Sequence, residues 1–88
     1  MSYSLSLQAR KQIEEFVLDG ILRTGDKITE RDMATRLGMS RAPIREAIRD
    51  LVNAGLLEQI SARQIVVRQL LVTEIEEIFY IRALLEGK

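Results

Sequence analysis

With 88 residues, of which 47% are hydrophobic and 30% charged, the chain can form one small domain with a single core, and its composition argues against disorder. It has no cysteine and no histidine, so we expect no catalytic site, cofactor or metal. No apolar run approaches the roughly 18 residues that span a bilayer, so we expect a cytoplasmic protein with no membrane partner. The formal net charge is zero because residues 1–68 carry +2 and residues 69–88 carry −2, a division that supports a nucleic-acid partner only weakly.

The first predicted element is a helix over residues 7–22. Apolar residues recur there at intervals of three and four, with charged residues between them, which is the pattern of an amphipathic helix. The apolar positions are Ala9, Ile13, Phe16, Val17 and Ile21. The sequence Thr24-Gly25-Asp26 then predicts a turn.

A second, shorter helix is expected after Thr29. Thr29 and Asp32 stand three residues apart, as in a capping box, and Gly38 can end the helix in a left-handed conformation. The predicted buried face consists of Met33, Ala34 and Leu37.

A third helix is predicted from Ser40 to about Asn53. The Ser40 side chain can cap it through the amide of Ala42, and Pro43 lies in the first turn, where a missing N–H costs nothing. The turn Gly38-Met39-Ser40 is so short that the second and third helices must cross steeply, as in a helix-turn-helix. Residues that match this motif are Met33, Ala34, Leu37, Gly38, Met39, Ile44 and Ala47. An ordinary helical hairpin with the same core residues is the alternative.

The third helix separates apolar from polar residues. One side carries Ile44, Ala47, Ile48, Leu51 and Val52, and the other carries Ala42, Arg45, Glu46, Arg49, Asp50 and Asn53. Arg45 and Arg49 lie one turn apart, and Arg41 projects from the helix start, where it can enter a major groove end-on. Arginine suits this position because its planar guanidinium can bond guanine O6 and N7 together or bind phosphates. The alternative is a solvated face on which Glu46 and Asp50 pair with nearby arginines.

A β-hairpin and a fourth helix are predicted after Gly55. Residues 56–60 and the β-branched run 65–67 flank the turn 61–64. Thr73 and Glu76 form another capping box, which opens a helix with apolar residues on more than one face. These are Ile75, Ile78, Phe79, Ile81, Leu84 and Leu85. Because such a helix needs packing partners on two sides, we expect a fragment, or a protein that completes its core by association.

Several segments together resemble the GntR family of bacterial regulators. They are residues 22–28 (LRTGDKI), 30–34 (ERDMA), 37–48 (LGMSRAPIREAI) and 51–57, and the block from Ser40 to Ala47 is the most specific. The similarity covers about residues 7–68. It implies a mainly α winged helix-turn-helix fold, in which a three-helix core and a small β-hairpin wing are followed by one further helix. The tail, residues 75–86, resembles the first helix of the FCD effector domain found in one subgroup.

The resemblance implies a set of DNA-contacting residues in and around the third helix. They are Arg31, Ser40, Arg41, Ala42, Arg45, Arg49, Arg63 and Gln64. Arg41 and Arg45 are expected to contact bases. Ser40 and Ala42 are expected to lie against backbone and bases, and Arg31 is expected to hold a phosphate or base at the groove edge.

The remaining three positions have weaker expectations. Arg49 is a candidate for a phosphate contact, and so is Arg63 at the wing tip. Gln64 stands where the family usually has glycine after the wing-tip arginine. Its side chain opposes the close minor-groove approach that glycine allows.

These expectations together describe one part of a larger regulator. Residues 1–68 are predicted to be the DNA-binding domain, 69–74 a linker, and 75–88 the first helix of a truncated C-terminal effector and dimerisation domain. The resemblance implies a homodimeric repressor or activator that reads an inverted-repeat operator in double-stranded DNA with helix three in the major groove. A small-molecule effector is expected to bind only through the absent C-terminal domain.

Two other functions are compatible with parts of the sequence. The near-neutral charge and Gln64 are compatible with a winged helix that binds an acidic protein partner. A small enzyme could use the clustered carboxylates Asp26, Glu30 and Asp32, but their spacing fits a capped turn better than an acid/base pair or a metal cage.

Overall fold

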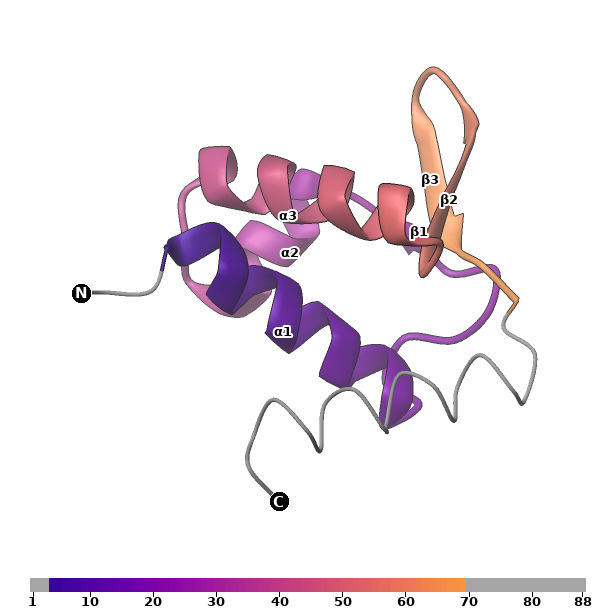
Figure 1. Cartoon of the computed structure of the whole chain (residues 1–88), viewed down its shortest axis with the longest axis horizontal. Helices are drawn as coiled ribbons and strands as arrows, with labels where there is room; N and C mark the ends of the chain where they lie inside the picture. The colour runs from indigo at the N-terminus through magenta and orange to yellow at the C-terminus, as the bar shows by residue number, and fades with distance from the viewer. Residues whose placement is uncertain (1–3, 70–88) are drawn as a thin grey trace.

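The computed structural model describes residues 4–69, which form three helices and a three-stranded antiparallel sheet (Figure 1). Helix α1 spans Leu5–Leu18, rather than the predicted residues 7–22. It begins early because the Ser4 hydroxyl accepts the amide N–H of Leu7 at 3.2 Å. It ends early because Gly20 adopts a left-handed conformation, with φ 79°. Ile21, which we expected on the apolar face of the helix, therefore follows it and is 55% exposed.

Helices α2 (Glu30–Leu37) and α3 (Arg41–Ala54) form the predicted helix-turn-helix. The Thr29 side chain caps α2 by accepting the amide N–H of Asp32 at 3.0 Å. Gly38 ends α2 with φ 64°, as predicted. Met39 then packs partly buried against the core, and its amide N–H donates to the carbonyl of Ala34 at 3.1 Å.

The sheet consists of β1 (Lys27–Ile28), β2 (Leu57–Ser61) and β3 (Gln64–Val67), in the order β1-β3-β2. The hairpin of β2 and β3 confirms the prediction, whereas β1 was missed because two residues are too short to show a pattern. Ser61 pairs with Gln64, and Gln59 pairs with Ile65, so one extra residue on β2 forms a bulge before the turn. No residue other than glycine has a positive φ within residues 4–69, so the loop avoids the turn types that favour glycine.

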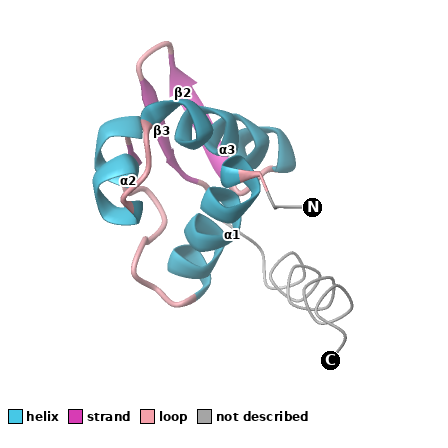
Figure 2. Ribbon diagram, turned by 90° about the vertical axis from the view of Figure 1, so that its left-hand side faces the viewer, coloured by secondary structure: helices cyan, strands magenta, loops and turns pink. Residues whose placement is uncertain are grey.

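One hydrophobic core joins the helices to the sheet. Its buried residues are Ala9, Ile13, Leu22, Ile28, Met33, Ile44, Ala47, Ile48, Leu51, Leu56, Leu57 and Val67. Helix α3 lies between the other elements: α1 packs on one side of it, and the hairpin projects beyond it on the other side (Figures 1 and 2). This arrangement leaves one long face of α3 on the surface next to the wing.

The predicted helix that opens at Thr73, and the boundary between residues 69–74 and 75–88, lie outside the described residues. Within residues 4–69, no helix is long and apolar enough to cross a membrane.

Candidate nucleic-acid interface

Helix α3 has the two faces that its sequence predicted. Ile44, Ala47, Ile48 and Leu51 are buried in the core, and Val52 packs partly buried against it. The residues predicted to face away are exposed, apart from the half-buried Asp50: Ala42, Arg45, Glu46, Arg49 and Asn53. The packing of one face therefore fixes which side chains the other face presents.

The start of α3 presents polar groups at an exposed helix end. Ser40 is the N-cap residue, with an extended backbone at φ −69° and ψ 167°, but its side chain makes no capping hydrogen bond. The predicted bond to the amide of Ala42 is therefore wrong: the Ser40 hydroxyl is not occupied by the helix that it precedes. Arg41 and Ala42 are exposed beside it. A hydroxyl and a guanidinium at a helix N-terminus suit an anion such as phosphate.

Arg45 is held by a carboxylate from the neighbouring helix. Its Nε donates to Glu30 Oε2 at 3.2 Å, and its Nη2 donates to Glu30 Oε1 at 3.3 Å. Both side chains remain on the surface, with 56% of Arg45 and 36% of Glu30 exposed. The hydrogen bonds to Glu30, followed by its negative charge, raise the pKa of Arg45 above its ordinary value. The contact with Glu30 thus orients the positively charged Arg45 guanidinium on the surface of α3.

Arg41 and Arg49 carry the other two positive charges of α3. Within residues 4–69, neither guanidinium forms an ion pair or a side-chain hydrogen bond. The alternative of intrahelical pairing with Glu46 and Asp50 is wrong for the described part of the chain, because Arg45 pairs with Glu30 instead. Both arginines are free to take an external anionic partner.

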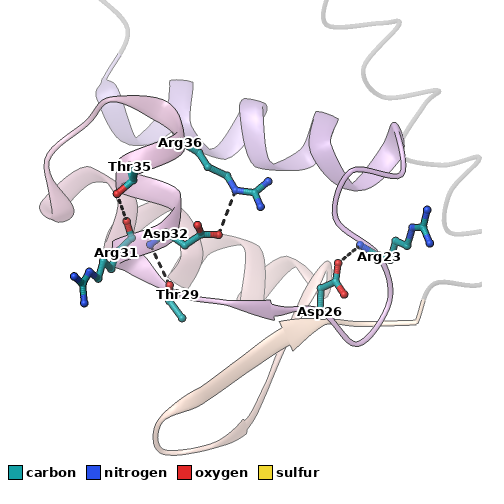
Figure 3. A network of polar contacts seen from close by, with 7 residues as sticks. All are labelled: Arg23, Asp26, Thr29, Arg31, Asp32, Thr35 and Arg36. Carbon is teal, nitrogen blue, oxygen red and sulfur yellow. Dashed lines mark hydrogen bonds and ion pairs between the residues drawn. The ribbon is translucent and has the colours of Figure 1, made fainter.

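Arg31 lies at the start of α2, one residue after Glu30. The hydroxyl of Thr35 donates to the carbonyl of Arg31 at 2.9 Å, so the backbone here belongs to the helix. The exposed guanidinium of Arg31 points away from the other labelled side chains (Figure 3). Because the ion pair joins Glu30 to Arg45, the first turn of α2 lies beside the exposed face of α3.

The wing supplies Arg63 and Gln64 from the other end of the motif. Arg63 lies in the hairpin turn and is exposed, and its amide N–H donates to the Ser61 hydroxyl at 3.4 Å. Gln64 is the first residue of β3 and is half-buried. The hairpin begins after the C-terminal end of α3, which at 14 residues is about 20 Å long. Arg63 is therefore well separated from Arg41, at the opposite end of the surface.

The clustered carboxylates all have local partners. The Asp26 carboxylate accepts the amide N–H of Arg23 at 2.8 Å, and Asp32 pairs with Arg36 at 3.2 Å (Figure 3). Glu30 is the partner of Arg45. No group of acidic side chains within residues 4–69 is arranged to hold a metal ion.

Sequence reasoning treated Glu30 only as a member of that cluster and missed its contact with Arg45. The two residues are 15 positions apart, so neither helical spacing nor a short motif connects them. The available signal was the short turn after Gly38, which brings the first turn of α2 against α3.

Comparison with known proteins identifies the family of this chain. The model of the bacterial regulatory proteins of the gntR family matches residues 5–67, which include all three helices and the wing. The chain belongs to the GntR family. The described fold, three helices with a small antiparallel sheet, is the winged helix of that family's solved structures.

Three relatives illustrate the similarity. The probable D-xylose utilization operon transcriptional repressor of Paenarthrobacter nicotinovorans is 37% identical over 84 residues, which cover 96% of this chain and 37% of the relative. The structure of Escherichia coli McbR/YncC has a TM-score of 0.70 at 32% identity, covering 97% of this chain and 40% of that one. The DNA-binding domain of AraR, in complex with operator ORX1, has a TM-score of 0.65 at 31% identity, covering 75% of this chain and 81% of that one.

This GntR chain is therefore a DNA-binding domain of the transcriptional-regulator type. Four curated relatives are named as transcriptional regulators, one of them as a probable repressor. The chain spans between 36% and 44% of the length of four curated relatives.

Proposed function

We propose that this domain reads an inverted-repeat operator by inserting α3 into the major groove, and that it serves a metabolite-responsive repressor of the FCD subgroup. The observation that carries the proposal is the exposed face of α3, which presents Arg41, Arg45 and Arg49 opposite the face that packs in the core. The AraR domain bound to its operator supports a DNA partner, and the D-xylose repressor supports repression.

Within this proposal, the arginines divide into two groups. Arg41 and Arg45 contact bases, because a guanidinium can bond guanine O6 and N7 at once. Arg31, Arg49 and Arg63 contact phosphates, which position the protein without reading sequence. Ser40 and Ala42 lie against backbone and bases, and Gln64 places a side chain at the wing where glycine would allow a closer approach to the minor groove.

The regulator acts as a two-fold dimer, so its operator is an inverted repeat whose half-site spacing follows from how the two domains are held. The effector is a small metabolite that binds in a C-terminal domain. The resemblance of residues 75–86 to the first FCD helix and the greater length of the relatives support this organisation.

The test begins with selection of bound sites from random duplex DNA, followed by gel-shift titration of the selected and scrambled duplexes. Arg45→Ala and Arg41→Ala should each reduce the ratio of operator to scrambled affinity by a factor of roughly 5 to 150, the discrimination that one bidentate base contact provides. Arg10→Ala is the matched control, since it removes the same charge from α1, and should leave the ratio unchanged. If both α3 variants kept the full ratio, α3 would not be the reading helix.

The arginines proposed to contact phosphates are tested by the salt dependence of binding. Arg31→Ala and Arg63→Ala should weaken binding to all duplexes equally and reduce the slope of log affinity against log salt by about 1 each. Unchanged slopes in both variants would remove these residues from the DNA surface. A domain that bound an acidic protein instead would discriminate no sequence in the selection.

A further inference from the structure

Glu30 lies on the surface that is proposed to face DNA, where a negative charge opposes binding. Its carboxylate takes two hydrogen bonds from one edge of the Arg45 guanidinium, the edge formed by Nε and Nη2. Glu30 is the first residue of α2, and the Thr29 cap fixes the backbone around it. The carboxylate is thus anchored on one helix and orients a side chain on the next.

The contact with Glu30 leaves some N–H groups of Arg45 available to bond a DNA base. A guanidinium has five N–H groups in one plane, and Glu30 uses two of them. Both hydrogens of Nη1 and one of Nη2 remain, and they include the pair on the end edge of the fork. That edge presents two parallel N–H groups, which can bond guanine O6 and N7 together. Because the guanidinium is rigid, fixing one edge fixes the direction of the other.

We propose that Glu30 is a positioning residue for base reading: it holds the Arg45 guanidinium so that its end edge faces the groove. This rests on the proposed role of Arg45. The ordering of a long side chain is then completed before DNA binds, which favours the correct base. At the same time, the Glu30 charge weakens attraction to phosphates at every sequence. Only the ordering of Arg45 changes the ratio of operator to non-specific affinity, because the charge of Glu30 acts on all sequences alike.

The experiment measures that ratio for Glu30→Gln, with the selected operator and a scrambled duplex at several salt concentrations. The glutamine cannot accept both hydrogen bonds from Arg45. We expect non-specific affinity to rise and the ratio to fall roughly 2- to 12-fold, the gain from ordering one long side chain in advance. Asp32→Asn is the matched control. It removes an equal charge from the same helical turn, but its partner is Arg36, so it should leave the ratio unchanged.

A double-mutant cycle with Arg45→Ala decides how Glu30 acts. In the Arg45→Ala background, Glu30→Gln should cause no further loss of discrimination. The melting midpoint of the Glu30→Gln variant should match that of Asp32→Asn, because exposed ion pairs contribute little to stability. A further loss of the ratio in the Arg45→Ala background would overturn the proposal, as would a ratio for Glu30→Gln equal to that of Asp32→Asn. Both results leave Arg45 as the reading residue. An unchanged ratio in Arg45→Ala would instead refute the base-reading role of Arg45, and an unchanged ratio in Arg41→Ala as well would refute the proposed function.

Discussion

Gly38 joins α2 to α3 in a left-handed conformation, and the cost of replacing it can be derived from its surroundings. Its φ is 64°, and a Cβ built at this position meets no atom within 4 Å. Gly38→Ala therefore adds no steric clash, and its cost is the strain of a left-handed alanine, about 1–2 kcal/mol. The smaller conformational entropy of alanine in the unfolded chain offsets part of this, so we expect a net loss of about 1 kcal/mol.

Thermal unfolding followed by circular dichroism measures this loss. For a domain of this size, about 1 kcal/mol corresponds to a fall in Tm of roughly 4–8 °C. Gly38→Asn is the matched variant and should cost less, because asparagine adopts the left-handed conformation more readily than alanine. Sequence discrimination on DNA should be unchanged in both folded variants, since the turn is strained but not displaced. A loss above about 3 kcal/mol, or none at all, would refute the reasoning, because either result requires a different turn geometry.

Three further predictions follow from other contacts. In urea unfolding, Thr29→Ala should destabilise the domain by about 1 kcal/mol because the Thr29 side chain caps α2. Ser40→Ala should change stability by less than about 0.5 kcal/mol, since the Ser40 side chain makes no capping hydrogen bond. A cost for Ser40→Ala equal to that of Thr29→Ala would contradict the observed cap. Leu51→Ala should cost roughly 2–5 kcal/mol in the same assay, because Leu51 is 1% exposed in the core, and a cost below 1 kcal/mol would show that the core can collapse around the cavity. Glu30 raises the pKa of Arg45, so the positive charge of Arg45 is lost only as the pH rises above the ordinary arginine range. The operator-to-scrambled ratio should therefore be constant from about pH 6.5 to 8.5. A change of the ratio within this pH range would contradict the role assigned to Arg45.

The helix-turn-helix was predictable because its determinants are local. The Thr29 cap, the glycine at position 38 and the apolar spacing of α3 act within a few residues of one another, and the structure confirms each of them. The ends of α1 were predicted less well. The apolar pattern continues through Ile21, but Gly20 takes a left-handed conformation and turns the chain before that pattern is complete. A periodic pattern locates a helix better than it locates the residue at which the helix ends.

Features that depend on distant parts of the chain escaped the sequence. Strand β1 exists because Lys27 and Ile28 pair with Val66 and Ile65, almost 40 residues later. The Ser40 side chain has a residue type and position suited to capping, yet its backbone begins the helix without the side-chain bond. The ion pair of Glu30 and Arg45 depends on how two helices cross, and the short turn after Gly38 indicates that crossing without showing which residues meet.

The net charge of the chain was the sequence feature that argued most against DNA binding, and the pairing of individual charges explains why it misleads. Four of the acidic side chains have partners of their own: Glu14 pairs with Arg10, Asp32 with Arg36, Glu30 with Arg45, and Asp26 with a backbone amide. Among the arginines without such a partner within residues 4–69 are Arg31, Arg41, Arg49 and Arg63. All four belong to α2, α3 or the wing. Because a phosphate responds to the charges nearest to it and screening removes the rest within about 10 Å, we expect these four arginines to contribute more to the attraction to DNA than the sum over the whole chain indicates.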